Sequence, residues 1–274
     1  RMKKRSVFER IAAIPPISWS VLFILAPLGF VLYFALTDRN GAFTWENITS
    51  LSSYSGTFVM SVGFSLIATT VCLLIGYPLA YCMSKTKERT RGILMVLLML
   101  PMWISLLIRT YSLMALLDNG GIVSGFLVKL GFEKLTFIGT EGAVILGMIY
   151  DFLPYMVLPI YTSITKLDRR YVEAAADLGC NNVKTMFRVI LPLTTPGIVS
   201  GVTMVFVPSI STFYISQKLG GGSFDLIGDI IERQFQNAVT YHTGAAVSLV
   251  MMILILISLA VMNRFTDSQE DIVV

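Results

Sequence analysis

Long apolar blocks constrain this 274-residue chain more than any other feature of its sequence. A helix rises 1.5 Å per residue, so about 20 apolar residues cross the ~30 Å hydrocarbon core of a bilayer. Only 14% of the residues are charged, against about 25% in a soluble globular domain. Six blocks are long enough and together make up about half of the chain: 17–36, 57–83, 92–117, 142–164, 196–218 and 244–262. We therefore predict an all-α integral membrane protein with six transmembrane helices.

The basic residues predict how the spans are oriented. Six spans place both termini on one side of the membrane. If that side is the cytoplasm, it receives most of the 21 lysines and arginines, including the basic tail before the first span and the short loop 84–91. Cytoplasmic loops carry such an excess of Lys and Arg. Both termini are thus predicted to be cytoplasmic, with the first span a retained anchor, and the net charge of +4 needs no nucleic-acid partner.

The sequence offers no constellation for catalysis or for a bound cofactor. Its single histidine, His242, lies at the outer end of the last block and is expected to be solvated, and its three cysteines are predicted to be free thiols. No Gly-Lys pair occurs, so the phosphate-binding loop of nucleotide-driven proteins is missing. We expect no catalytic residues, no metal site and no cofactor bound by this chain. If the chain moves a solute uphill, the energy must come from a partner or an ion gradient.

The loop 165–195 between the fourth and fifth blocks is the longest predicted cytoplasmic loop. Its pattern predicts two short helices at a sharp corner: Asp168 can cap the first, and Gly179 suits the left-handed position that ends it. Asn181 or Asn182 can cap the second, which Leu191-Pro192 is expected to end. From the residues alone, two readings remain open. The hairpin could lie on the lipid surface, or it could be a docking knob for a cytoplasmic protein.

The same loop carries a recognisable motif. Glu173-Ala174-Ala175, then Gly179, then Val189-Ile190-Leu191-Pro192 resembles the EAA signature of permease subunits of ATP-binding-cassette importers, with Val189 where isoleucine is usual. Further likeness lies in Leu100 to Ser105, Arg109-Thr110-Tyr111 and Tyr150 to Tyr161. These segments are most similar to the B-type permeases of spermidine/putrescine importers. The resemblance implies a type I importer permease fold, with residues 1–274 as a single transmembrane permease domain.

The resemblance also implies partners and roles. Glu173, Ala174, Ala175 and Gly179 would form the knob that couples to an ATPase subunit, and Leu191 and Pro192 would fix the hairpin against the fifth span. ATP and magnesium would be used by that ATPase. A second, homologous permease chain of the C type and an extracytoplasmic solute-binding protein would complete the importer in the bacterial cytoplasmic membrane.

Asp151 is the residue singled out for substrate, because a carboxylate in the middle of a span usually faces a cavity or a partner. With Tyr150, Tyr155 and Trp103, it could offer charge pairing and cation–π contacts to a polyamine. The alternative for Asp151 is a structural ion pair. Arg109 is expected to be an anchor reaching the membrane interface or the partner of an outer acid. The acidic side of the stretch 224–237 is expected to be a solvated face.

Other functions stay open from the sequence. A permease for another small solute, such as sulfate or molybdate, shares much of the pattern. A secondary transporter would need more spans or inverted repeats with paired broken helices, and neither is visible. A membrane-embedded enzyme would need clustered His, Cys or acidic residues.

Overall fold

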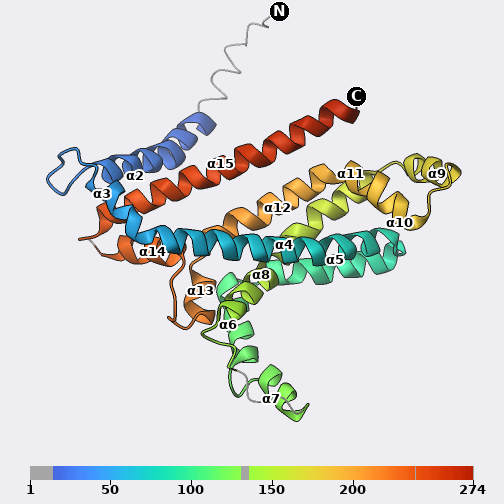
Figure 1. Ribbon diagram of the computed structural model, residues 1–274, viewed down its shortest axis with the longest axis horizontal. Coiled ribbons are helices and arrows are strands. Elements are labelled where there is room, and N and C mark those ends of the chain that lie inside the picture. The colour runs from blue at the N-terminus through green and yellow to red at the C-terminus, as the bar shows by residue number, and fades with distance from the viewer. Residues whose placement is uncertain (1–14, 131–135, 238, 274) are drawn as a thin grey trace, which may run out of the picture. The chain divides into compact units, whose positions relative to one another are not determined.

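The computed structural model describes residues 15–130, 136–237 and 239–273, with Leu127 and residues 265–273 described by their backbone alone. The described chain is helical, apart from one isolated antiparallel bridge between Thr37 and Phe43 (Figure 1). The basic tail before the first span lies outside the described residues. The chain divides into two compact units, Arg1–Ser55 with Ile230–Ile253, and Gly56–Asp229 with Leu254–Val274.

In the first unit, the first and the last apolar helices pack against each other through small side chains. Ala35, from α2, packs with Ala245 and Ala246 at the start of α15. The sequence predicted a solvated His242, but its side chain is half-buried. Its Nδ1 atom lies 3.0 Å from the Phe34 carbonyl oxygen. The unit contains η1 (Val21–Leu25), α2 (Ala26–Leu36), α3 (Glu46–Thr49), η2 (Ser50–Tyr54) and parts of α14 (Ile227–Gln236) and α15 (Tyr241–Val273).

The second unit is organised around α8 (Glu141–Lys166), whose buried residues form the centre of the larger apolar core. Two glycines of α12, Gly197 and Gly201, contact α8 so closely that a Cβ atom would meet it. Gly76 of α4 also lies against α8, at Met156. The other helices of the unit are α4 (Ser55–Lys85), α5 (Glu88–Trp103), α6 (Leu106–Leu117), α7 (Ile122–Lys129), α9 (Arg169–Asp177), α10 (Asn182–Thr185), η3 (Met186–Ile190), α11 (Leu191–Leu193), α12 (Thr195–Ile210) and α13 (Tyr214–Leu219).

The apolar blocks become four long helices and two bent pairs. Helices long and apolar enough to cross a membrane are Pro15–Leu36, Glu46–Lys85, Glu141–Lys166 and Tyr241–Arg264. The bent pairs are Glu88–Trp103 with Leu106–Phe126, at 99°, and Asn182–Leu193 with Thr195–Ile210, at 66°. The described chain therefore supplies up to six spans if each bent pair is one span.

Two predicted spans are not single straight helices. The block 92–117 breaks after Trp103, where Ile104 and Ser105, three and four residues beyond the helix-weakening Pro101, leave helical geometry. The block 196–218 breaks at residues 211–213, between α12 and α13. The second helix of the loop 165–195 does not stop at Leu191-Pro192, where the sequence predicted its end. It runs on to Leu193 and turns at Thr194 into α12.

Candidate functional site

The segment between α8 and α12 folds as the predicted hairpin. The Asp168 side chain caps α9 by accepting the Arg170 N–H at 3.0 Å, and the Asn181 side chain caps α10 by accepting the Lys184 N–H at 2.8 Å. Gly179 lies between them with a φ of +77°, a conformation that residues with a Cβ rarely adopt. Short-range capping thus fixes the corner, and this part of the sequence prediction is confirmed.

The hairpin leaves apolar side chains uncovered. Ala175 and Ile190 are buried, whereas Leu178 is 85% exposed and Phe187 is 65% exposed. Val183 is exposed as well. These three residues, Leu178, Val183 and Phe187, are called the apolar tip below. An apolar surface of this kind typically marks an interaction site or a membrane contact.

The predicted coupling residues lie around this tip. Glu173, Ala174 and Gly179 are exposed, and Ala175 is buried beneath them. Leu191 is half-buried and Pro192 is exposed, both in α11 next to the turn into α12. The sequence thus indicated correctly which residues share the hairpin, although its second helix is longer than expected.

A buried hydrogen bond, which the sequence did not indicate, holds the turn at Thr194. The hydroxyl groups of Tyr77, in α4, and Thr194 lie 3.0 Å apart, and both side chains are buried. The Thr194 hydroxyl also donates to the Ile190 carbonyl oxygen at 2.8 Å. The base of the hairpin is therefore attached to α4 as well as to α8 and α12. No spacing rule relates Tyr77 to a residue 117 positions away.

Asp151 is buried in an ion pair with Arg109 of α6. Arg109 Nη1 lies 3.3 Å from Asp151 Oδ1 and donates to the Asp151 carbonyl oxygen at 3.2 Å. The Thr110 hydroxyl donates to Asp151 Oδ2 at 3.4 Å. Arg109 is 6% exposed and Asp151 1% exposed, so the Arg109 side chain is enclosed by the protein and paired with an acid. The structure places Asp151 in the ion pair that the sequence left open as an alternative.

The other predicted substrate residues do not gather around Asp151. Trp103, the last residue of α5, is 80% exposed, and Tyr150 is exposed on α8. Tyr155 is half-buried with its ring edge toward Phe152, at a centroid distance of 6.4 Å. In the described chain, no side-chain hydrogen bond or ring contact joins these four residues to one another. Their assignment to a substrate pathway stays a prediction.

An aromatic cation site lies elsewhere in the second unit. The Lys218 ammonium of α13 lies 5.4 Å from the Tyr111 ring centroid and 5.7 Å from that of Tyr214. The two rings meet edge to face at 6.0 Å. A primary ammonium group is thus held by two aromatic rings. The sequence did not indicate that these three residues form one site, because α6 and α13 come together only in the folded unit.

Asp229, in the segment between the last two apolar blocks, is not on a solvated face. It is buried, and its Oδ2 accepts the Leu226 N–H at 2.7 Å. Burial raises the pKa of Asp229 to about 6, although the hydrogen bond from Leu226 opposes that shift. The acidic pattern of 224–237 is therefore only partly a solvent-facing surface.

Comparison with known proteins assigns the family. Residues 72–270 match the family of binding-protein-dependent transport system inner membrane components. The chain is 39% identical over 267 residues to the spermidine/putrescine transport system permease protein PotB of Haemophilus influenzae, covering 94% of this chain and 93% of that protein. The PotB of Escherichia coli K12 is 38% identical over 258 residues, covering 90% and 94%. The chain belongs to the family of binding-protein-dependent transport system inner membrane components.

Solved structures agree on the fold of this permease. A bacterial ABC transporter involved in the import of alginate contains a chain that superimposes with a TM-score of 0.74 at 18% identity, covering 94% of the permease and 95% of that chain. The MetNI methionine ABC transporter gives a TM-score of 0.58 at 16% identity, covering 77% and 94%. The permease is thus a multi-pass membrane protein with an importer-permease fold. The matched segment contains the hairpin and the Arg109–Asp151 pair.

The described residues place no three His, Cys, Asp or Glu side chains together as a metal site. The family is one of transport system components.

Proposed function

We propose that this permease is one membrane subunit of an ATP-driven polyamine importer in the bacterial cytoplasmic membrane. The likeness to the spermidine/putrescine permeases over nearly the whole chain carries this proposal. A second permease chain of the C type and an extracytoplasmic binding protein complete the assembly, and both termini lie in the cytoplasm.

The hairpin is the proposed contact with the ATPase. Glu173, Ala174, Ala175 and Gly179 form the knob, and the apolar tip enters a groove of the partner. Leu191 and Pro192 transmit its movement to α12. The support is geometric: the hairpin is rigidly capped, exposes apolar side chains and is joined to α8, α12 and, through Tyr77, α4. ATP and magnesium are bound by the ATPase and none by this chain.

Uptake in vesicles tests the substrate. The permease is reconstituted with its ATPase, second permease chain and binding protein, and radiolabelled spermidine uptake is measured with ATP. We expect ATP-dependent uptake that putrescine reduces and sulfate leaves unchanged. Competition by sulfate or molybdate, with no effect of putrescine, would instead favour the anion permease that the sequence left open.

A further inference from the structure

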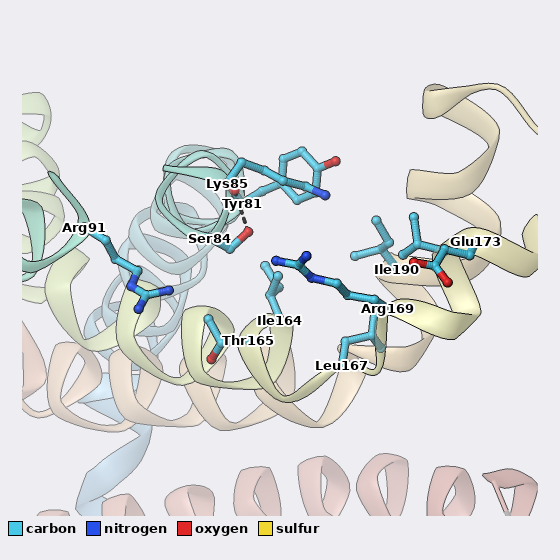
Figure 2. Close-up of a pocket in the computed structure, with 11 residues that line it drawn as sticks. Tyr81, Ser84, Lys85, Arg91, Ile164, Thr165, Leu167, Arg169, Glu173 and Ile190 are labelled. Atoms are coloured by element: carbon cyan, nitrogen blue, oxygen red, sulfur yellow. Dashed lines mark hydrogen bonds between the residues drawn. The ribbon is translucent and has the colours of Figure 1, made fainter. Parts of the chain in front are cut away.

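A basic cavity lies beside the first turn of α9, within the second unit. Its volume is about 450 Å³. The lining comes from the ends of α4 and α8, the start of α5, and α9. Figure 2 shows the cavity with its lining side chains.

Three cationic side chains and a single carboxylate line this space. Lys85 is the last residue of α4, Arg91 belongs to the first turn of α5, and Arg169 is the first residue of α9. The carboxylate, Glu173, lies on the Ile190 side of the cavity, whereas the Arg169 side chain extends away from it toward Ser84 (Figure 2). The lining is therefore electropositive on the side where α4, α5 and α9 meet.

These cations have little internal compensation. Arg91 makes a long ion pair with Glu88 at 3.9 Å. Lys85 lies over the Tyr81 ring at 5.4 Å, and neither Lys85 nor Arg169 forms an ion pair with a described carboxylate. The hydroxyl of Ser84 donates to the Tyr81 carbonyl oxygen at 2.7 Å. Lys85 and Arg169 thus offer the cavity charged hydrogen-bond donors without a carboxylate partner, which favours an anion over a neutral polar ligand.

The position of the cavity selects the kind of anion. α4 and α8 are apolar enough to cross a membrane. The 26 residues of α8 measure about 39 Å, longer than the ~30 Å hydrocarbon core. The ends of these helices, at Lys85 and Thr165, therefore reach the level of lipid headgroups. Basic pockets between helices at this level bind anionic lipid headgroups, and guanidinium groups fit pairs of phosphate oxygens.

We propose that the cavity binds a phosphate-bearing anion, either an anionic phospholipid headgroup or free phosphate, through Lys85, Arg91 and Arg169. The bound anion joins the ends of α4 and α5 to the first residue of α9. The positive end of the α9 dipole adds to the attraction. The site therefore holds the first arm of the hairpin against the spanning helices.

Binding is tested with the purified full chain in a neutral detergent, using thermal unfolding at constant ionic strength. One arm titrates inorganic phosphate against chloride, and the other titrates dihexanoyl phosphatidylglycerol against dihexanoyl phosphatidylcholine. We expect a concentration-dependent rise in the unfolding temperature with phosphate, with phosphatidylglycerol, or with both. Stabilisation by the lipid alone assigns the headgroup, and stabilisation by phosphate alone assigns the free anion.

A charge-matched pair of variants shows whether the cavity is responsible. The cavity variant is Lys85→Gln/Arg91→Gln/Arg169→Gln. The control, Lys87→Gln/Arg89→Gln/Arg170→Gln, removes three neighbouring cations that do not line the cavity. We expect the cavity variant to lose at least about tenfold in apparent affinity, since three charge-assisted contacts are removed, and the control to stay within about twofold.

Absence of any stabilisation of the wild-type chain would overturn the proposal. Equal losses in the two triple variants would also overturn it, by showing diffuse charge attraction instead of a site. If the cavity variant does not fold, the single variants Arg169→Gln and Arg170→Gln make the same comparison at two exposed neighbours. No arm uses polyamine or ATP, so the outcome is independent of the proposed transport function.

Discussion

The carboxylate of Asp229 is held inside the second unit by the N–H group of Leu226, 2.7 Å from its Oδ2. Desolvation disfavours the charged carboxylate, and this raises the pKa of Asp229 to about 6. Between pH 4 and 6 the folded protein therefore binds more protons at this residue than the unfolded chain does. The stability that Asp229 contributes is present below its unfolded pKa and is lost as the pH rises through about 6.

We expect Asp229→Asn to remove this pH dependence. Asparagine keeps an oxygen for the Leu226 N–H but carries no charge. Lowering the pH from 7 to 5 should raise the stability of the wild type relative to the variant, by on the order of 1 kcal/mol. Unfolding temperatures of both proteins in detergent across this range measure the difference. Parallel pH profiles would contradict the assignment.

Arg109 and Asp151 are buried charges that compensate each other. Removing one member of a buried pair leaves the other uncompensated, which costs about 3–5 kcal/mol. We expect Asp151→Asn to lower the yield of folded protein sharply. The double variant Arg109→Gln/Asp151→Asn should recover most of it, because no isolated charge remains. Detergent stability of the three proteins measures this, and equal losses in the single and double variants would refute the pairing.

The same variants decide the predicted substrate role of Asp151. If the carboxylate meets a substrate ammonium, the folded double variant should transport spermidine poorly. Near-normal uptake, normalised to folded protein in the membrane, would remove Asp151 from the substrate pathway.

At the scale of the elements, two glycines set the approach of α12 to α8. A Cβ atom at Gly197 would lie 2.9 Å from the Pro159 carbonyl oxygen and closer still to Ser163, and one at Gly201 would lie 3.1 Å from the Met156 carbonyl oxygen. Small residues let membrane helices approach closely. The hairpin extends from this pair of helices, so their packing determines where it is held.

We expect Gly197→Ala to destabilise the permease by about 1–3 kcal/mol, because the backbone of α8 must move to accept the methyl group. Gly63→Ala is the matched control, a helical glycine of α4 whose Cβ would meet nothing within 4 Å. Alanine there should be neutral or stabilising by up to about 1 kcal/mol, through its helix propensity. The two unfolding temperatures measure the contrast, and similar losses at both positions would argue against close packing at Gly197.

Local rules account for the elements that the sequence predicted well. Apolar length predicts where spanning helices lie, and the caps at Asp168 and Asn181 depend on residues two and three positions away. The break after Trp103 was less predictable, because Pro101 indicates a kink but not that Ile104 and Ser105 become extended. The Tyr77–Thr194 bond and the Lys218 site depend on which helices pack together, and the local patterns of a sequence do not indicate that packing.

At the scale of the whole molecule, the importer mechanism needs a rigid connection between an ATPase and the spanning helices. The hairpin meets this need because its corner is fixed by Gly179 and its base by the buried Thr194. In the proposed importer, the ATPase covers the exposed apolar tip. The sequence also allowed the hairpin to lie on the lipid surface. In that arrangement, Glu173 and Gly179 would have no function in coupling.

We expect Glu173→Lys and Gly179→Asp to uncouple the importer while the permease stays folded in the membrane. Both residues are exposed, and each change places a new charge where the ATPase is proposed to dock. Gly179→Asp also strains the corner of the hairpin, because Gly179 has a φ of +77°, so Glu173→Lys is the variant that tests charge alone. ATP turnover and spermidine uptake in the reconstituted complex should each fall by at least about tenfold, the effect of losing about 1.4 kcal/mol at the contact. Glu88→Lys, a charge reversal at an exposed glutamate outside the hairpin, should leave both rates near those of the wild type. Normal turnover and uptake in Gly179→Asp would show that the hairpin does not couple to the ATPase, and the same loss in Glu88→Lys would attribute the effect to net charge.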